Sequence, residues 1–155
     1  MSAPVEDLDR IMAVMTTAFP PDYGEAWNRR QVSDSLLIGR TRYGLIDAQG
    51  RPDPVDASST AGFFLSRSIF DEEELLLFAI APACRRKGLG DCLLRRFIDE
   101  AREMGMSRIF LEMREGNPAG ILYRKHGFQQ VGIRPGYYRS LEGDRISAIS
   151  QELRL

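Results

Sequence analysis

A short basic turn that contains two glycines is the stretch of this chain best suited to chemistry. The turn has the sequence RRKGLG over residues 85–90 and follows an apolar run that ends at Ile80. Asp91 then opens a stretch with apolar residues at helical spacing. Glycines let the backbone approach a ligand, and the first N–H groups of a helix attract negative charge. A strand, this turn and a helix would therefore form a site for an anion.

Two common phosphate motifs do not fit the turn. A P-loop requires Lys followed by Ser or Thr, whereas here Gly90 is followed by Asp91 and Cys92. A dinucleotide fingerprint needs a third glycine, and only Gly-x-Gly is present. An alternative stays open at this point, in which the glycines only start a helix and the basic residues form a solvated rim.

Composition and charge narrow the range of functions. The chain has 155 residues, enough for one domain with a substantial core, and is 43% hydrophobic and 28% charged. A formal net charge of -1 argues against a general nucleic-acid binder. No apolar run approaches the ~20 residues of a membrane span, and residues 1–10 are acidic where a signal peptide would be basic. We therefore expect one cytoplasmic domain over residues 1–155, with no membrane partner and no direct nucleic-acid partner.

Few side chains in the sequence could hold a metal. Cys84 and Cys92 flank the glycine turn, and His126 is the single histidine. A metal site would need more Cys and His at ligand spacing, so we expect two free thiols and no metal. His126 precedes a glycine that would end a helix, and we expect it to be an exposed residue at that helix end.

The spacing of apolar residues predicts a mixed sheet with helices on both faces. Ser2 and Pro4 indicate the start of the first helix, and Gly105 indicates the end of the third. The acidic run at residues 71–74 is expected to be a solvated turn, and residues 51–60 a loop. Helices are expected over residues 5–18, 26–36, from the glycine turn to Gly105, and over 117–127; strands are expected over residues 42–47, 61–68, 75–80, 108–113, 128–134 and 145–153.

Residues 74–138 resemble the GNAT superfamily of acetyltransferases, and within it the RimI-type ribosomal-protein alanine N-acetyltransferases. The turn at residues 85–90 matches the Arg/Gln-x-x-Gly-x-Gly/Ala signature of that superfamily, whose loop holds the pyrophosphate of acetyl-CoA. The other matching motifs follow in the family's order. They are FAIAP at residues 78–82, LEMR at 111–114, Asn117, LY at 122–123, GF at 127–128, GIR at 132–134 and the pair Tyr137-Tyr138.

The resemblance implies a fold and a cofactor site. The implied fold is the α/β (α+β) GNAT fold, a mixed, mostly antiparallel sheet of about six to seven strands with helices on both faces and a splayed central parallel pair. The gap in that pair would admit the pantetheine arm of acetyl-CoA, the implied co-substrate, and no metal is implied. The implied cofactor-binding residues are Phe78, Ala79, Ile80, Arg85, Arg86, Lys87, Gly88, Leu89, Gly90, Asp91 and Asn117.

The resemblance also implies direct attack of an acceptor amine on the thioester. The amine must be neutral and the leaving thiolate benefits from a proton, so a base and an acid are needed. Glu112 matches the family's base, and Tyr123 matches its acid. The alternatives are that Glu112 is a charge on a solvated strand face and that Tyr123 is a core aromatic. Tyr137 and Tyr138 are the implied substrate-binding residues.

The acceptor is less narrowly defined than the cofactor. The resemblance implies the N-terminal α-amine of a protein, in the subgroup a ribosomal protein, and a monomer or weak homodimer. The subgroup commonly has Glu-Asp-Ala after the Tyr-Tyr pair, whereas this chain has ISA at residues 146–148. The stretch from Asn117 to Tyr123 is also one residue shorter than is usual in the family. Acetylation of a small amine or a lysine side chain is an alternative, and so is a non-catalytic sensor of acyl-CoA.

Overall fold

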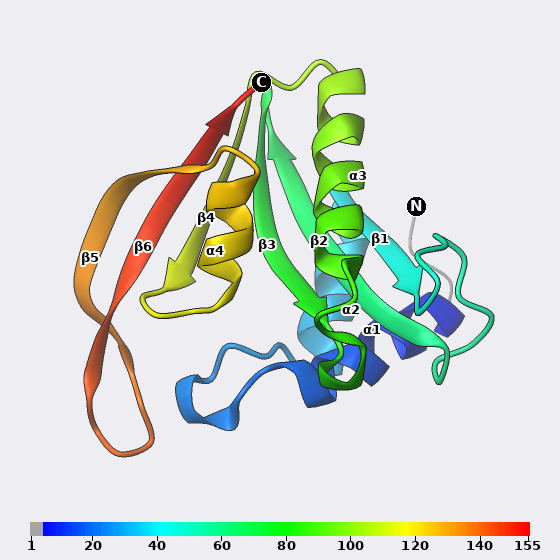
Figure 1. The fold of residues 1–155 in the computed structure, drawn as a ribbon, viewed down its shortest axis with the longest axis horizontal. Helices are drawn as coiled ribbons and strands as arrows, with labels where there is room; N and C mark the ends of the chain where they lie inside the picture. Colours follow the sequence, from blue (N-terminus) through cyan, green and yellow to red (C-terminus); the bar gives the residue numbers. More distant parts are fainter. Residues whose placement is uncertain (1–4) are drawn as a thin grey trace.

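The computed structural model describes residues 5–155, in which helices and strands follow the expected alternation (Figure 1). The expected start signal at Ser2 and Pro4 lies outside this range. Within the range, no helix is long and apolar enough to cross a membrane. The elements are α1 (Val5–Ala18), the 3-10 helix η1 (Pro21–Tyr23), α2 (Arg29–Leu37), β1 (Thr41–Asp47), β2 (Thr60–Ile69), β3 (Glu72–Ile80), η2 (Pro82–Cys84), α3 (Leu89–Glu103), β4 (Arg108–Arg114), α4 (Ala119–Lys125), β5 (Gln129–Arg139) and β6 (Arg145–Arg154).

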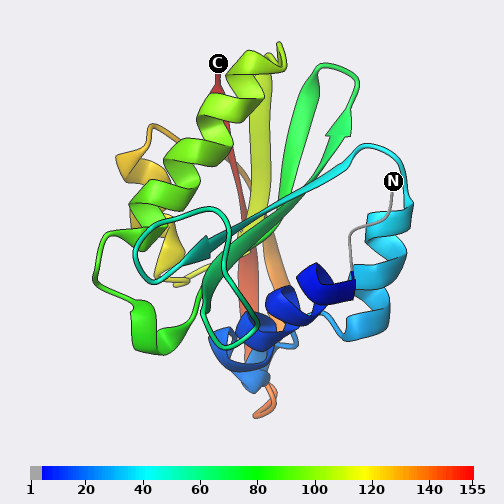
Figure 2. The same cartoon turned by 90° about the vertical axis from the view of Figure 1, so that its right-hand side faces the viewer.

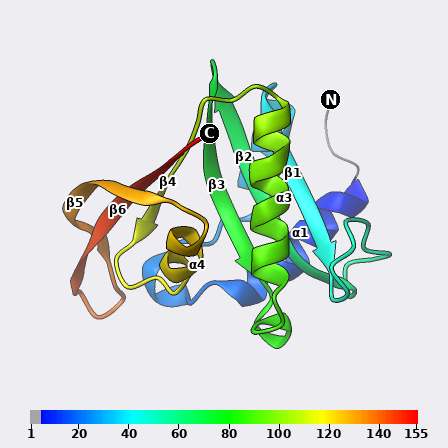
Figure 3. The same ribbon diagram turned by 45° about the horizontal axis from the view of Figure 1, so that its top comes forward.

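The strands form one mixed sheet in the order β1-β2-β3-β4-β6-β5. Neighbouring strands are antiparallel except β3 and β4, which run parallel. The β3–β4 pairing covers only Glu72–Glu74 opposite Arg108–Phe110, and beyond it the two strands spread apart (Figures 1 and 3). The expected mixed, mostly antiparallel sheet with a splayed central parallel pair is therefore confirmed.

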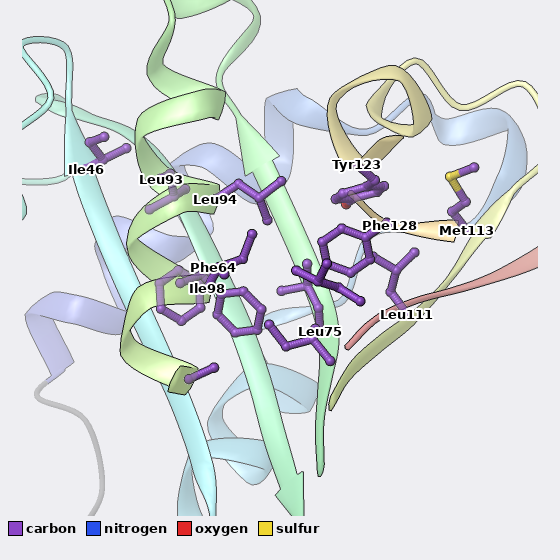
Figure 4. Packing of buried hydrophobic residues seen from close by; sticks show 14 of the residues in the cluster. Ile46, Phe64, Leu75, Leu93, Leu94, Ile98, Leu111, Met113, Tyr123 and Phe128 are labelled. Atoms are coloured by element: carbon purple, nitrogen blue, oxygen red, sulfur yellow. The ribbon is translucent and has the colours of Figure 1, made fainter. Parts of the chain in front are cut away.

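Helices cover both faces of the sheet, as expected (Figure 2). On one face, Leu93, Leu94 and Ile98 of α3 are buried against strand residues such as Phe64 (Figure 4). On the other face, a second cluster joins α1 and α2 to the sheet and includes the fully buried Ile11. Burying each such side chain contributes about 1.5–3 kcal/mol relative to leaving it exposed. The central strands are thus fixed from both sides.

The second helix, α2, begins at Arg29 rather than at Ala26 because Asn28 caps it. The Asn28 side chain accepts a hydrogen bond from the Gln31 N–H at 2.8 Å, and the Gln31 side chain accepts one from the Asn28 N–H at 2.8 Å. This capping box satisfies two N–H groups that the helix itself leaves unpaired. The segment before it, residues 19–28, therefore stays outside the helices α1 and α2, and we call it the strap.

The expectation of a solvated turn at residues 71–74 is wrong, because Glu72–Glu74 belong to β3. Glu73 is only 1% exposed, and its Oε1 accepts hydrogen bonds from Arg42 Nε at 2.9 Å and Ser66 Oγ at 2.6 Å. A carboxylate can be buried when a cation and hydrogen bonds replace its contacts with water. The acidic run therefore extends the central strand to its short pairing with β4.

The fifth strand, β5, continues to Arg139, past the expected end at Arg134. Between Arg134 and Tyr138 its pairing with β6 shifts register, which leaves residues 135–137 opposite Ser147 alone. Gly136 within this bulge has a φ of 62°, in the left-handed region that glycine adopts without strain. Because a bulge redirects the side chains around it, it affects where the two tyrosines at 137 and 138 point.

Candidate active site

A cleft of about 420 Å³ opens where β3 and β4 have separated, and we call it the first cleft. All of the implied cofactor-binding residues line it except Lys87, whose side chain is exposed beside it. The clustering agrees with the implied cofactor site, although the role of each residue stays a prediction. The lining residues are Ala18, Phe19, Pro20, Glu25, Phe78, Ala79, Ile80, Cys84, Arg85, Arg86, Gly88, Leu89, Gly90, Asp91, Arg114, Asn117, Pro118, Ala119 and Leu122.

The glycine turn presents backbone rather than side chains to the first cleft. Arg86 and Gly88 have left-handed φ values of 64° and 79°, and no side chain caps the start of α3 at Leu89. The first N–H groups of that helix therefore have no intrahelical or capping partner. A Cβ at Gly90 would lie 3.2 Å from Leu122 Cδ2, so the wall at this position is close-packed. This arrangement suits an anion held by N–H groups.

The arginine at position 85 has a structural role that the sequence did not indicate. Its Nε donates to the Ile80 carbonyl at 3.0 Å, and its Nη2 donates to the Ala18 carbonyl at 2.8 Å. These bonds join the end of α1 to the end of β3. The side chain of Leu89 is buried in the core at 5% exposure, which leaves its backbone N–H as the group that it could offer to a ligand.

The carboxylate of Asp91 links the start of α3 to the end of α4. Its Oδ1 lies 3.0 Å from Lys125 Nζ and 3.0 Å from His126 Nε2. Lys125 first and His126 second lower the pKa of Asp91 below its ordinary value. His126 is half-buried rather than exposed as expected, because it faces this carboxylate. Across residues 5–155, no group of three or more His, Cys, Asp or Glu side chains is placed to hold a metal ion.

A second cleft of about 250 Å³ adjoins the first. It contains the implied base, the implied acid and both implied substrate-binding tyrosines. Four residues line both clefts: Phe19, Glu25, Phe78 and Asn117. The remaining lining residues of the second cleft are Gly24, Trp27, Leu75, Leu76, Leu77, Leu111, Glu112, Met113, Tyr123, Tyr137 and Tyr138.

The side chain of Glu112 lies at the wall of the second cleft. It alternates along β4 with Leu111 and Met113, which pack into the core on the α3 and α4 side, so it faces the opposite side of the strand. Its Oε2 lies 3.1 Å from Arg134 Nε and 3.5 Å from Ser150 Oγ. With 24% of its side chain exposed, Glu112 is neither a fully solvated charge nor a buried one.

The phenol of Tyr123 reaches the second cleft from α4, on the other side of the sheet. Its ring packs against Phe78 at 6.2 Å and Phe128 at 5.6 Å between centroids, and Phe128 lies beside it in Figure 4. Burial first, and then the negative charge of Glu25, raises the pKa of Tyr123 well above its ordinary value. Tyr123 is thus both a core aromatic and a phenol that keeps its proton, as a proton donor must.

The two tyrosines Tyr137 and Tyr138 line the second cleft together, although neighbours in a regular strand point to opposite faces. The bulge in β5 accounts for this difference. Their rings form an edge-to-face pair with centroids 5.1 Å apart. Burial, followed by the charges of Glu112 and Glu25, raises the pKa of Tyr138.

Two charged residues of the site were missed by the sequence analysis. Arg114 Nε donates to Glu25 Oε1 at 3.4 Å, and the Arg114 guanidinium lies 4.0 Å from the centre of the Tyr23 ring. Arg114 stands in the LEMR motif, which could have drawn attention to it. Glu25 lies in the strap, where no motif or periodicity marks it.

Asn117 uses part of its side chain within the protein. Its Oδ1 accepts a hydrogen bond from the Ala119 N–H at 3.0 Å, at the start of α4. The amide NH₂ group remains for a ligand in either cleft, since Asn117 lines both.

Comparison with known proteins agrees with this fold and site. Residues 55–130 match the family described as acetyltransferase (GNAT) domain. The chain is 36% identical over 95 residues to the ribosomal protein bS18-alanine N-acetyltransferase of Haemophilus influenzae. That alignment covers 61% of this chain and 65% of the relative, just under two thirds of the relative's length.

Solved structures of acetyltransferases also resemble this chain, one of them over nearly its whole length. The crystal structure of the ribosomal-protein-S18-alanine N-acetyltransferase from Escherichia coli matches 99% of this chain and 91% of its own, with a TM-score of 0.81 and 28% identity. The structure of yncA, a putative acetyltransferase from Salmonella typhimurium with its cofactor acetyl-CoA, covers 62% of this chain and 58% of its own, with a TM-score of 0.56 and 28% identity. The chain is therefore similar to the GNAT superfamily of acetyltransferases in sequence and in fold. Within it, the curated relative and the Escherichia coli structure are both ribosomal-protein alanine N-acetyltransferases.

Proposed function

We propose that this protein transfers the acetyl group of acetyl-CoA to the N-terminal α-amine of a protein. The observation that carries the proposal is the meeting of two clefts where β3 and β4 separate. The first cleft has a backbone-lined turn for an anionic cofactor. The second places Glu112 and Tyr123, from opposite faces of the sheet, at its wall. A sensor without catalysis would have no need of this acid and base.

The residues of the first cleft fit acetyl-CoA. Gly88 leaves open the space beside the turn, since a Cβ there would meet nothing within 4 Å, and a cofactor can lie against the backbone at this position. The N–H groups at the start of α3 suit its pyrophosphate. Beyond Glu74, the edge of β3 that faces β4 is unpaired, so Phe78–Ile80 can offer backbone groups to amides of the pantetheine arm. Bound there, acetyl-CoA supplies an activated thioester.

Glu112 and Tyr123 carry out the proton transfers. A free N-terminal amine is mostly protonated at neutral pH, because its pKa is about 8. Glu112, held at the wall by Arg134 and Ser150, accepts that proton directly or through a water. Tyr123 keeps its own proton because burial raises its pKa, and it donates that proton to the leaving sulfur.

The acceptor that we propose is the N-terminus of a ribosomal protein in the cytoplasm. The names of the similar proteins, which act on an alanine of bS18 or S18, support this acceptor. The second cleft supports it too, because its volume of about 250 Å³ and its aromatic walls suit a small first residue. Tyr137 and Tyr138 would contact the peptide there.

The test is a comparison of acceptors. The protein is incubated with acetyl-CoA and one of three acceptors, and the release of free CoA is measured. The acceptors are an Ala-starting hexapeptide, the same peptide with a blocked N-terminus and an internal lysine, and spermidine. We expect turnover with the first acceptor only. The blocked peptide without lysine is the matched blank.

The other results would each replace part of the proposal. Turnover confined to spermidine or to the lysine peptide would change the acceptor. Tight binding of CoA without turnover of any amine would indicate a sensor.

A further inference from the structure

The residue Glu25 occupies the junction of the two clefts. Among residues 5–155, only four residues line both clefts, and Glu25 is the one that carries a charge. It lies in the strap, between η1 and α2, and its side chain is 12% exposed. A thioester in the first cleft and an amine in the second would have to meet at this junction.

The carboxylate of Glu25 has hydrogen-bonding capacity to spare. Arg114 Nε donates to its Oε1 at 3.4 Å, and this is the only hydrogen bond to the Glu25 side chain within residues 5–155. Charge-assisted hydrogen bonds are typically about 2.7–2.9 Å long, so this contact is a loose one. Arg114 is itself 11% exposed and fixed at the end of β4, over the Tyr23 ring. One oxygen of Glu25 is therefore left for a second cation.

The second cleft is built for a positively charged group. Its only charged lining residues in the described chain are Glu25 and Glu112. Glu112 is already bound by Arg134 at 3.1 Å, whereas Glu25 has the looser partner. The negative charge of Glu25 also raises the pKa values of Tyr123 and Tyr138, which is consistent with its lying near both hydroxyls.

We infer that Glu25 binds the protonated amine of the acceptor and holds it at the junction of the two clefts. The inference rests on the proposed acetyltransferase function and assigns the contact by which a cationic acceptor is recognised. Arg114 keeps one oxygen of Glu25 in place, and the ammonium group takes the other. Glu112 then accepts the proton. The acetylated product is an uncharged amide, so it loses this ion pair and is bound less tightly than the acceptor.

The experiment separates recognition of charge from chemistry. Steady-state kinetics with the Ala-starting hexapeptide are compared for the wild type, Glu25→Gln and Glu25→Asp. For Glu25→Gln we expect the KM for the peptide to rise about 10- to 100-fold, the effect of losing one hydrogen bond between charged groups. The kcat and the KM for acetyl-CoA should change by no more than about threefold, because Glu112 and Tyr123 remain. Glu25→Asp keeps the charge and should recover part of the loss.

A binding measurement gives a readout that a merely structural role would not move. In the presence of CoA, calorimetry compares the free hexapeptide with its N-acetylated form. The wild type should prefer the free amine, and Glu25→Gln should lose that preference while its affinity for the acetylated peptide stays the same. Glu115→Gln is the matched control, since Glu115 is exposed beside the end of β4 and lines neither cleft.

The outcomes distinguish this inference from the proposed function. An unchanged peptide KM in Glu25→Gln, or a fall in kcat alone, overturns the inference and leaves the function standing. Absence of turnover on every amine in the wild type overturns both. Glu25→Gln leaves Arg114 without its partner, and the variant protein could unfold for that reason. In that case the double variant Glu25→Gln/Arg114→Met, which also removes the charge of Arg114, is measured instead. It must show the same loss of preference for the free amine over the acetylated peptide. A double variant that keeps the preference of the wild type also overturns the inference.

Discussion

The largest part of the first cleft comes from one continuous stretch of chain, residues 78–91, with additions from the end of α1, the strap, the end of β4 and the start of α4. The second cleft draws its walls from the strap, the middle of β3, the end of β4, α4 and the bulge of β5. The first cleft has the uncapped backbone N–H groups at the start of α3 and the glycines of the turn, beside the residues Arg85, Arg86 and Asp91. The second offers the side chains of carboxylates and tyrosines. Substitutions should therefore act through space and backbone in the first cleft, and through charge and proton transfer in the second.

The largest effect is expected in the second cleft, from Tyr123→Phe. In the proposed reaction the phenol of Tyr123 protonates the leaving sulfur, and general-acid catalysis contributes about 100- to 10,000-fold. We expect kcat to fall by at least about 100-fold while the affinity for CoA stays within about twofold, since the ring still packs against Phe78 and Phe128. A steady-state assay of CoA release measures kcat, and calorimetry measures the affinity for CoA. If Tyr123→Phe turned over at the rate of the wild type, the role of Tyr123 would be purely structural.

A smaller, pH-dependent effect is expected from Glu112→Gln. The substitution keeps the shape and removes basicity, so the rate should fall by about 10- to 100-fold near neutral pH. It should recover in part as the pH rises above about 8, because the acceptor amine then loses its proton in solution. The pH profile of kcat/KM for the peptide is the measurement. A profile parallel to that of the wild type at every pH would mean that Glu112 only shapes the strand.

The difference between the clefts also explains which of them could be predicted from sequence. The first cleft follows from local signals, since an apolar run, a glycine turn and a helical stripe lie next to one another. The helix α1 likewise spans Val5–Ala18 as its periodicity predicts. The second cleft depends on contacts between distant residues. Glu25 and Arg114 are 89 positions apart, and neither has a local pattern that indicates the other.

Two further features that the sequence could not explain have the same physical origin. In the sequence, Glu73 is typical of a solvated turn. In the fold, Arg42, which is 31 positions away, donates a hydrogen bond to its buried carboxylate. The tyrosines at 137 and 138 were named from a family motif, but only the β5 bulge explains how both line one cleft. Sequence alone predicts elements and turns well because these are local. Ion pairs and bulges are set by tertiary pairing.

In the first cleft, Gly90→Val tests the backbone-lined turn. The Cβ at this position would already meet Leu122 Cδ2 at 3.2 Å, and the branched side chain would project beside the start of α3. We expect the Kd for acetyl-CoA to rise about tenfold, equivalent to about 1.4 kcal/mol, with kcat at saturation little changed. Isothermal calorimetry gives the Kd, and a melting curve checks that the fold survives.

Gly88→Ala is the matched variant for the same turn. A Cβ there would meet nothing within 4 Å, but Gly88 has a φ of 79°. The cost of placing alanine in this region is about 1–2 kcal/mol, so stability should fall more than affinity. Equal affinity in Gly90→Val and the wild type would show that the turn does not hold the cofactor.

The smallest effect is expected from Asp91→Asn, which removes a charge from the first cleft. Lys125 and His126 lower the pKa of this carboxyl in the folded state, so its contribution to stability is present above the unfolded pKa of about 3.9 and is lost as the pH falls through the lower folded value. The ion pairs are partly solvated, and their loss should reduce the free energy of unfolding at pH 7 by less than about 1 kcal/mol. Urea unfolding at pH 7 and at pH 3, where the difference should shrink, measures this.

The same variant tests the contrast between the clefts. Because we propose that backbone groups hold the cofactor in the first cleft, the Kd for acetyl-CoA should change by no more than about twofold in Asp91→Asn, less than about 0.5 kcal/mol. Asp99→Asn on the same helix is the control, since within residues 5–155 Asp99 pairs only with Arg102, at 3.5 Å, and lies outside both clefts. A tenfold change confined to Asp91→Asn would mean that side-chain charge contributes to the first cleft as it does to the second. The distinction between a backbone-built and a side-chain-built cleft would then no longer hold.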